Sequence, residues 1–173
     1  MKYEITNEAH PDNPNLRRIK ALRDFGDVKK GDLGGYIESE ENLSHDGDAW
    51  VYGNAWVYGN AKVYGDAWVY GNAKVYGNAK VYGNAEVCGD AKVSGDAWVY
   101  ENAKVYGNAE VYGVAKVSGD AKVFGFAKVY GGAVLSWNAV VSGDTVVSGD
   151  TEEPVSQFPN EITIDGVVYV KKA

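Results

Sequence analysis

The feature that most constrains this chain is a six-residue unit that repeats without a break from Gly47 to Ser148. The unit reads Gly-Asn/Asp-Ala-x-Val-x, and the 102 residues of this stretch hold 17 units. A fixed short period is typical of a solenoid, in which each unit packs only against its neighbours. The repeat therefore predicts the architecture before any single residue is considered.

Within one unit, the alternation of side chains along a strand places the Ala and Val positions on the same side. Valine is β-branched and suits a buried pleated surface, so these two positions are predicted to form the core. The residues before and after each valine then point outward. Glycine, asparagine and aspartate tolerate left-handed backbone angles, so each Gly-Asn or Gly-Asp pair is predicted to be a corner.

One unit then makes a short strand and a turn of about 120°, and three units close one coil. Parallel stacking at roughly 4.8 Å predicts nearly six coils and a prism about 27 Å long. A series of hairpins is disfavoured, because a six-residue step that always turns one way cannot reverse the chain at every corner. The predicted fold class is all-β: a parallel β-helix with a small N-terminal cap and a C-terminal β-hairpin. The period does not fix the hand of the helix.

Four segments are expected along the chain: an N-terminal cap and lead-in over 1–46, the repeat over 47–151, a linker with two prolines over 152–160, and a hairpin over 161–173. The hairpin is predicted from the Asp165-Gly166 pair between two β-rich runs, a strong signal for a two-residue turn.

The lead-in segment is less regular than the repeat. The polar run 7–15, with prolines at 11 and 14, predicts a loop. Residues 16–25 fit either a helix or a strand, and a strand is favoured because a turn follows at Gly26. Ile37 and Leu43 lie six apart and are expected to be core positions of an imperfect first coil.

Segments 24–31, 34–37, 42–44 and 47–52 resemble the start of YdcK-like proteins, a family of bacterial and phage hexapeptide-repeat proteins, and the repeat units resemble the bacterial transferase hexapeptide repeat. The resemblance covers about residues 16–148. It implies a left-handed β-helix and a homotrimer. For the acyltransferases of this superfamily it implies a histidine base on a coil, a projecting loop and a groove for the acyl donor between subunits.

Outward residues eighteen positions apart are predicted to stack on one side of the prism, so all three sides carry aromatic ladders interleaved with lysines. Stacked rings stabilise the coils by about 0.5–1.5 kcal/mol per pair, and stabilisation alone is one interpretation of the ladders. The other is a binding surface for a ligand or partner. The candidate binding residues are Trp50, Trp68, Tyr52, Tyr70, Tyr58, Tyr76, Tyr64, Tyr82, Lys62, Lys74, Lys80 and Lys92.

The repeat departs from its consensus near its C-terminal end, where apolar residues replace corner or outward polar ones. We expect this apolar cluster to contact another chain or the C-terminal segment, and random drift of the repeat is the alternative. The candidate oligomer contacts are Val114, Phe124, Phe126 and Trp137.

Recognisable catalytic chemistry is sparse in the sequence. The only histidines are His10 and His45; neither lies in a repeat, and no insertion interrupts the 17 units. His45 is a weak candidate base at the first coil, and a plain loop role is favoured. No metal site and no cofactor are expected, except acetyl-coenzyme A if the chain is an acyltransferase. Cys88 is the only cysteine, so no internal disulfide can form, and it reads as a small residue in a tyrosine position.

The formal net charge of −7 disfavours direct nucleic-acid binding. The absence of an apolar run at the start predicts a cytoplasmic protein without a membrane span, in the host cytoplasm if the chain is phage-encoded. The favoured function is a non-enzymatic, phage-related binding scaffold, which holds a host protein or a small anionic, nucleotide-like ligand and so counters a host process. The alternatives are an acyl-CoA-dependent acyltransferase and an acidic DNA mimic.

Overall fold

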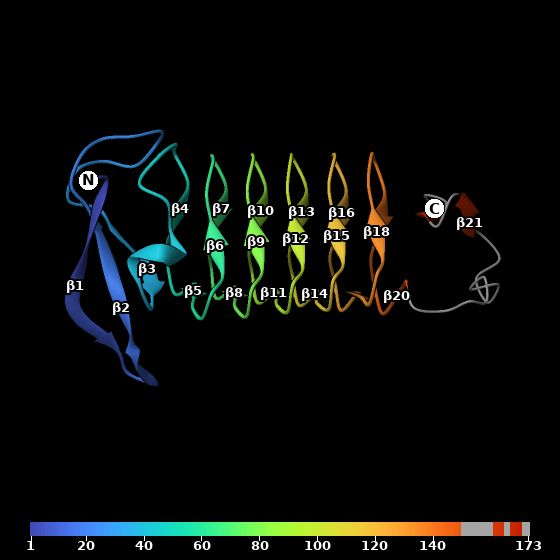
Figure 1. The fold of residues 1–173 in the computed structure, drawn as a ribbon, viewed down its shortest axis with the longest axis horizontal. Helices are drawn as coiled ribbons and strands as arrows, with labels where there is room; N and C mark the ends of the chain where they lie inside the picture. Colours follow the sequence, from blue (N-terminus) through green and yellow to red (C-terminus); the bar gives the residue numbers. More distant parts are fainter. Residues whose placement is uncertain (150–160, 165–166, 171–173) are drawn as a thin grey trace.

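The repeat folds into a three-sided β-solenoid, seen from the side in the computed structural model (Figure 1), which describes residues 1–149, 161–164 and 167–170. Strands eighteen residues apart pair in parallel, so that Lys92 lies between Lys74 and Glu110. The predicted fold class is confirmed as an all-β solenoid of stacked parallel coils. The left-handed sense remains a prediction.

Three sheets form the three sides, and each is named here after its first strand in the repeat. The β4 side contains β4 (Trp50–Val51), β7 (Trp68–Val69), β10 (Glu86–Val87), β13 (Lys104–Val105), β16 (Lys122–Val123) and β19 (Val140–Val141). The β5 side contains β5 (Trp56–Val57), β8 (Lys74–Val75), β11 (Lys92–Val93), β14 (Glu110–Val111), β17 (Lys128–Tyr130) and β20 (Val146–Ser148). The β6 side contains β6 (Lys62–Val63), β9 (Lys80–Val81), β12 (Trp98–Val99), β15 (Lys116–Val117) and β18 (Val134–Leu135).

The core is a column of alanines and valines along the axis of the solenoid. From Ala49 to Val129, every residue at the two predicted core positions is at most 1% exposed. The burial follows from the period, because each valine packs against the valines of the coils above and below. The predicted core is therefore confirmed, except that Ala139 and Thr145 near the C-terminal end of the repeat are only partly buried.

An N-terminal cap closes the first coil. It consists of β1 (Tyr3–His10), β2 (Asn13–Ala21), β3 (Leu33–Ile37) and the short 3-10 helix η1 (Glu40–Asn42). Ile37 pairs with Val57 and Leu43 with Val63, so both are core positions of the first coil, as predicted. Of the strand favoured over 16–25, residues 16–21 form the end of β2, and residues 22–25 lie outside it.

The loop predicted over 7–15 is wrong. These residues lie in an antiparallel hairpin in which β1 pairs with β2 and the chain turns at Pro11 and Asp12. The polar residues are compatible with strands because much of this hairpin faces solvent, where a strand needs no continuous apolar side.

The cap also satisfies the polar groups at the open end of the first coil. The Lys2 ammonium donates hydrogen bonds to the carbonyl oxygens of Gly47 (3.2 Å) and Ala49 (2.7 Å), and the Tyr3 hydroxyl donates to Leu43 O (2.7 Å). Lys2 is fully buried, and this burial lowers its pKa to about 8. Without these donors, the carbonyl groups would be buried and unpaired.

Trp50 is a correction to the predicted outward ladder. Its side chain is 2% exposed, because the rings of Tyr3 and Phe25 pack against it at 6.2 and 5.3 Å between centroids. The residue occupies an outward position of the repeat, but the cap covers that position in the first coil.

The predicted C-terminal hairpin is present as β21 (Glu161–Ile164) and β22 (Val167–Val170), which pair antiparallel. Strand β22 continues the β6 side, with Val167 paired to Val134 of β18. The turn at 165–166 and the linker predicted over 152–160 lie outside the described residues.

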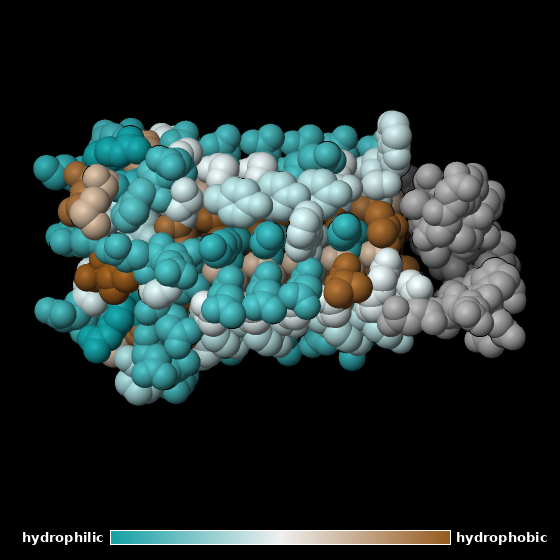
Figure 2. All heavy atoms as spheres, viewed as in Figure 1, coloured by the Kyte–Doolittle hydropathy of each residue, from teal (hydrophilic) through white to brown (hydrophobic). Residues whose placement is uncertain are grey.

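The sequence suggested one cluster of apolar residues near the C-terminal end of the repeat. In the structure these residues are spread over the prism instead. Val114, Phe126 and Trp137 are exposed by 55%, 63% and 73%, and each lies on a different corner of the prism. Phe124 stacks on Tyr106 within the β4 side, at 4.9 Å. Figure 2 shows brown, hydrophobic atoms exposed on one face near this end of the solenoid. The role of these residues in oligomer contacts remains a prediction.

Two corners break the glycine rule. Glu101 and Trp137 both have φ of 59°, a left-handed conformation that the other coils give to glycine at this corner. The Glu101 carboxylate accepts a hydrogen bond from the Gly119 amide at 2.6 Å, which offsets part of the strain. The Trp137 side chain makes no comparable hydrogen bond to another described residue.

Replacing Trp137 with glycine is therefore expected to increase the free energy of unfolding by about 1 kcal/mol, since a left-handed non-glycine residue costs that much and the exposed ring buries little. Glu101→Gly is the matched control and should gain less, because it also removes the carboxylate–amide hydrogen bond. Urea unfolding followed by circular dichroism measures both. A less stable Trp137→Gly protein would contradict this account.

The aromatic ladders stack in register on each side. On the β6 side, the Tyr82 ring lies between those of Tyr64 and Tyr100, at 4.8 and 5.1 Å, with planes within 5°. Burial raises the pKa of Tyr82 above its ordinary value of 10.0, and the neighbouring Tyr64 and Tyr100 raise it further. The folded protein thus resists ionisation of this hydroxyl.

This raised pKa predicts a loss of stability in alkali. Unfolded tyrosines ionise near pH 10.0 while folded Tyr82 stays neutral, so its contribution is complete below that pH and is lost as pH rises through the folded pKa. Tyr82→Phe should therefore lose less stability than the wild type between about pH 9 and pH 11 in urea unfolding. Lys2 acts in the opposite sense from about pH 8 upward, but equally in both proteins. Equal slopes in the two proteins would refute the prediction.

Candidate binding site

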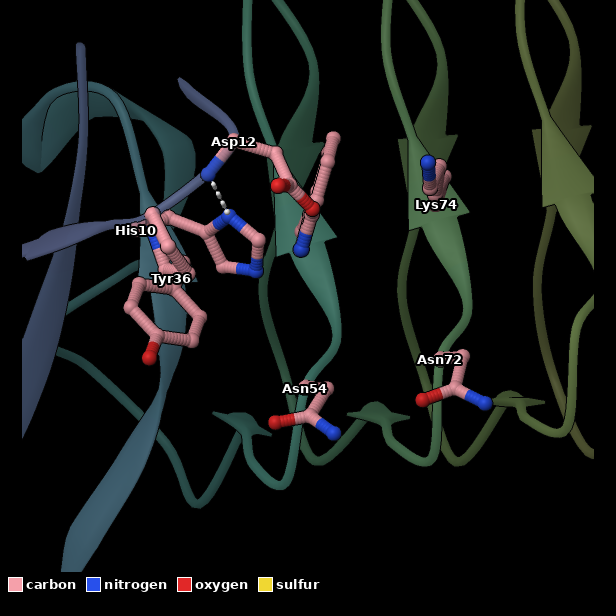
Figure 3. A pocket seen from close by; sticks show the side chains of 8 residues that line it. His10, Asp12, Tyr36, Asn54, Asn72 and Lys74 are labelled. Atoms are coloured by element: carbon pink, nitrogen blue, oxygen red, sulfur yellow. Dashed lines mark hydrogen bonds between the residues drawn. The ribbon is translucent and has the colours of Figure 1, made fainter. Parts of the chain in front are cut away.

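A pocket of about 410 Å³ lies where the turn of the β1–β2 hairpin hangs over the β5 side (Figure 3). We call it the overhang pocket. Its lining residues come from the hairpin, from β3 and from two coils of the solenoid: His10, Pro11, Asp12, Tyr36, Asn54, Trp56, Asn72 and Lys74.

The hairpin is held in place over Tyr36 of β3. The Arg18 guanidinium lies 4.5 Å from the centre of the Tyr36 ring and donates to Gly34 O at 2.9 Å. Its Nε also pairs with the Glu8 carboxylate at 2.7 Å. These contacts tie both strands of the hairpin to the sheet, so the turn keeps its position above the first coils.

His10 is fixed between two aromatic rings. Its imidazole packs edge-to-face against Tyr36 (4.6 Å, 83°) and Trp56 (4.5 Å, 66°). The Nδ1 atom accepts a hydrogen bond from the Asp12 amide at 3.1 Å. A neutral imidazole has one protonated nitrogen, so Nε2 carries the hydrogen and is a donor. Figure 3 shows Nε2 on the side of the ring towards Asn54 in this view.

Lys74 brings a positive charge to the same pocket. Its ammonium lies 3.7 Å from the centre of the Trp56 ring, a close cation–π contact. It forms no ion pair with any residue that the structure describes. The Asp12 carboxylate is exposed at the turn. The pocket thus combines an N–H donor, an uncompensated cation and an indole ring, with one negative charge at its rim.

The twelve residues predicted to bind do not form a single site. Lys74, Tyr58, Tyr76 and Lys92 lie on the β5 side; Tyr52, Trp68, Tyr70 and the buried Trp50 lie on the β4 side; Lys62, Tyr64, Lys80 and Tyr82 lie on the β6 side. Of these, only Lys74 lines the overhang pocket. His10, Tyr36 and Trp56 were missed, although Trp56 occupies the same outward position of its unit as Trp50.

A second pocket, of about 310 Å³, lies at the start of the β4 side. It does bring together Trp50, Tyr52 and Trp68, but its charged residues are the carboxylates of Asp27 and Asp32. With no cation in its lining, this pocket is poorly suited to an anionic ligand.

His45 lies at a third pocket, of about 400 Å³, beside Lys62 and Tyr64. Its Nδ1 accepts a hydrogen bond from the Lys2 amide at 3.2 Å, and its ring stacks on Tyr3 at 4.3 Å. Its Nε2 is buried and has no hydrogen-bond partner in the described chain. A general base needs a free lone pair within reach of a substrate, and His45 offers none in this arrangement.

Metal-binding clusters and membrane-spanning helices are both absent from the described part of the chain. No group of three or more histidine, cysteine, aspartate or glutamate side chains is placed to hold a metal ion. Among these same residues, no helix has the length and apolar character needed to cross a bilayer.

Comparison with known proteins agrees with the geometry of the coils. A family model described as the YdcK β-solenoid repeat matches residues 55–71, which run from just before β5 to just after β7. Residues 55–71 are therefore similar to the YdcK β-solenoid repeat. It is 36% identical over 50 residues to the uncharacterized acetyltransferase YdcK of Escherichia coli (strain K12). That alignment covers 29% of this chain and only 15% of the relative.

The hydrogen bond from Asp12 predicts the protonation of His10 in this YdcK-like solenoid. Neutral His10 should be the Nε2–H tautomer, since Nδ1 accepts from a backbone amide. Long-range proton–nitrogen correlation NMR on ¹⁵N-histidine protein measures this, with His10→Gln as the assignment control. A dominant Nδ1–H tautomer would show that the hairpin turn does not hold the ring as described.

Proposed function

We propose that this YdcK-like solenoid is a non-enzymatic binding module whose overhang pocket holds a small ligand with a planar ring and a negative charge. The observation that carries the proposal is the convergence of His10 Nε2–H and the Lys74 ammonium beside the Trp56 ring. Donors bind the charged group of such a ligand, while the indole contacts its ring.

Charge limits the class of ligand. The chain has a formal net charge of −7, and the Asp12 carboxylate lies at the rim of the pocket. Both repel a polyanion, whereas a single negative charge can be neutralised by Lys74 alone. An aromatic carboxylate is therefore a better fit than a triphosphate.

Within this chain, the overhang pocket is lined by residues of the hairpin, of β3 and of two coils. A homotrimer with clefts between subunits, a phage origin and a host protein partner remain proposals based on resemblance. None of them is required for a ligand to bind here.

Calorimetric titration with benzoate, benzyl alcohol and acetate tests the proposal, since only benzoate combines the ring with the charge. His10→Ala and Lys74→Met should each weaken benzoate binding by about tenfold, the effect of one lost charge-assisted hydrogen bond.

Lys80→Met is the matched control, because Lys80 makes a similar contact with Trp98 (4.7 Å) on the β6 side but no hairpin covers it. This variant should bind benzoate as the wild type does. Benzoate binding that survives His10→Ala and Lys74→Met unchanged would disprove the role of the overhang pocket.

Acyl transfer is the second candidate, favoured by the printed name of the relative and by a histidine in a pocket beside the coils. It requires His10 to accept a proton at Nε2, which the present tautomer does not allow without a change in the Asp12 contact. Release of coenzyme A from acetyl-coenzyme A, abolished by His10→Ala but not by His45→Ala, would replace the binding-only function.

A further inference from the structure

The tyrosine ladder of the β5 side lacks one ring. Tyr58 stacks on Tyr76 at 5.1 Å and 5°, and Tyr112 stacks on Tyr130 at 5.0 Å and 6°. The equivalent position between these two pairs is Ser94, one coil from Tyr76 and one coil from Tyr112, because β11 pairs in register with both β8 and β14.

The missing ring leaves a cavity. A space of about 250 Å³ is lined by Tyr76, Lys92, Ser94, Glu110 and Tyr112. Two coils separate the flanking tyrosines, which corresponds to roughly 10 Å at the usual strand spacing. One flat ring placed midway would contact both tyrosines with the spacing seen elsewhere in the ladder. We call this space the ladder gap.

The inner edge of the ladder gap is polar. Lys92 opens β11 (Lys92–Val93), and Ser94 directly follows that strand two residues later, so both side chains point to the same side, in the plane that an inserted ring would take. The Glu110 carboxylate reaches back to the Lys92 ammonium at 3.1 Å. The edge of the inserted ring would thus meet an ammonium donor, a carboxylate acceptor and the hydroxyl of Ser94.

The comparable gap on the β4 side is closed by the protein itself. Cys88 interrupts the ladder between Tyr70 and Tyr106, but the Tyr70 hydroxyl donates to the Glu86 carboxylate of the next coil at 3.1 Å. Hydrogen bonding to Cys88, together with burial, raises the pKa of Tyr70. The Tyr70 side chain therefore leans into this gap, whereas no such contact of Tyr76 or Tyr112 crosses the ladder gap at Ser94 among the described residues.

We propose that the ladder gap at Ser94 is a binding site for a nucleobase, inserted between Tyr76 and Tyr112. A nucleobase is flat on both faces and carries donors and acceptors on its edge, which match Glu110, Lys92 and Ser94. A plain phenyl ring would make no hydrogen bonds to these groups. Because the chain is acidic, an uncharged nucleoside fits better than a phosphorylated one.

Adenosine and uridine are the probes, with benzyl alcohol as the ring that lacks a polar edge. Saturation-transfer NMR and calorimetry should show adenosine bound more tightly than benzyl alcohol. Ser94→Tyr fills the gap with the protein's own ring and should weaken adenosine binding by at least about tenfold. The same variant should melt at a higher temperature, because it adds two stacked pairs, and this readout shows that it folds.

Cys88→Tyr is the matched control, since it adds a tyrosine at the interrupted position of another ladder and should leave adenosine binding unchanged. Equal adenosine binding by wild type and Ser94→Tyr would overturn the site. Benzyl alcohol bound as tightly as adenosine would overturn the choice of a nucleobase, as would no adenosine binding up to about 10 mM. The site is independent of the overhang pocket, so His10→Ala should not affect it.

Discussion

The backbone hydrogen bonds between successive coils set the spacing between equivalent residues of neighbouring coils. The Lys92 amide donates to Ala109 O and the Ser94 amide to Val111 O, both at 2.9 Å, and the same pattern recurs along the three sides. Each outward position is therefore held about one strand spacing from its equivalent in the next coil. That spacing is close to the contact distance of aromatic rings, so tyrosines at equivalent positions stack as a consequence of the backbone. A continuous aromatic ladder therefore says little about function. A ladder that lacks one ring, or an outward residue that the cap covers, is more informative.

Prediction from the sequence worked where the same local rules apply in each unit. The alternation of small, β-branched and outward residues recurs in seventeen units, with only Leu135 and Thr145 departing from Val and Ala, so one correct inference about Val93 holds for the whole column of valine positions. The sides to which Tyr76 and Lys92 belong also follow from counting by eighteen. Even the imperfect first coil could be placed, because Ile37 and Leu43 keep the spacing of six.

The main failures involve contacts between segments that the period does not relate. Trp50 has the same sequence context as Trp68, which is only partly buried, and Trp50 is fully buried because cap residues such as Tyr3 and Phe25 pack against it. His10 was assigned to a loop because polar residues and prolines surround it. The six-residue period does not extend to β1 and β2, so it could not predict that these strands pair. The overhang pocket therefore could not be found from the repeat. The three sides also differ in a way that the sequence hides: the β5 sheet continues into the cap, the β6 sheet into β22, and the β4 sheet into neither among the described strands.

The buried lysine at the first coil has a consequence for assembly. A solenoid end presents a row of strand edges that can template the addition of another chain, which is how cross-β fibres grow. Here the Lys2 ammonium already occupies the carbonyl oxygens of Gly47 and Ala49. An incoming strand would have to displace a charged donor and bury it again elsewhere, at a high desolvation cost. The cap thus blocks the addition of further strands at the first coil, so that this end of a highly regular solenoid does not extend into a fibre.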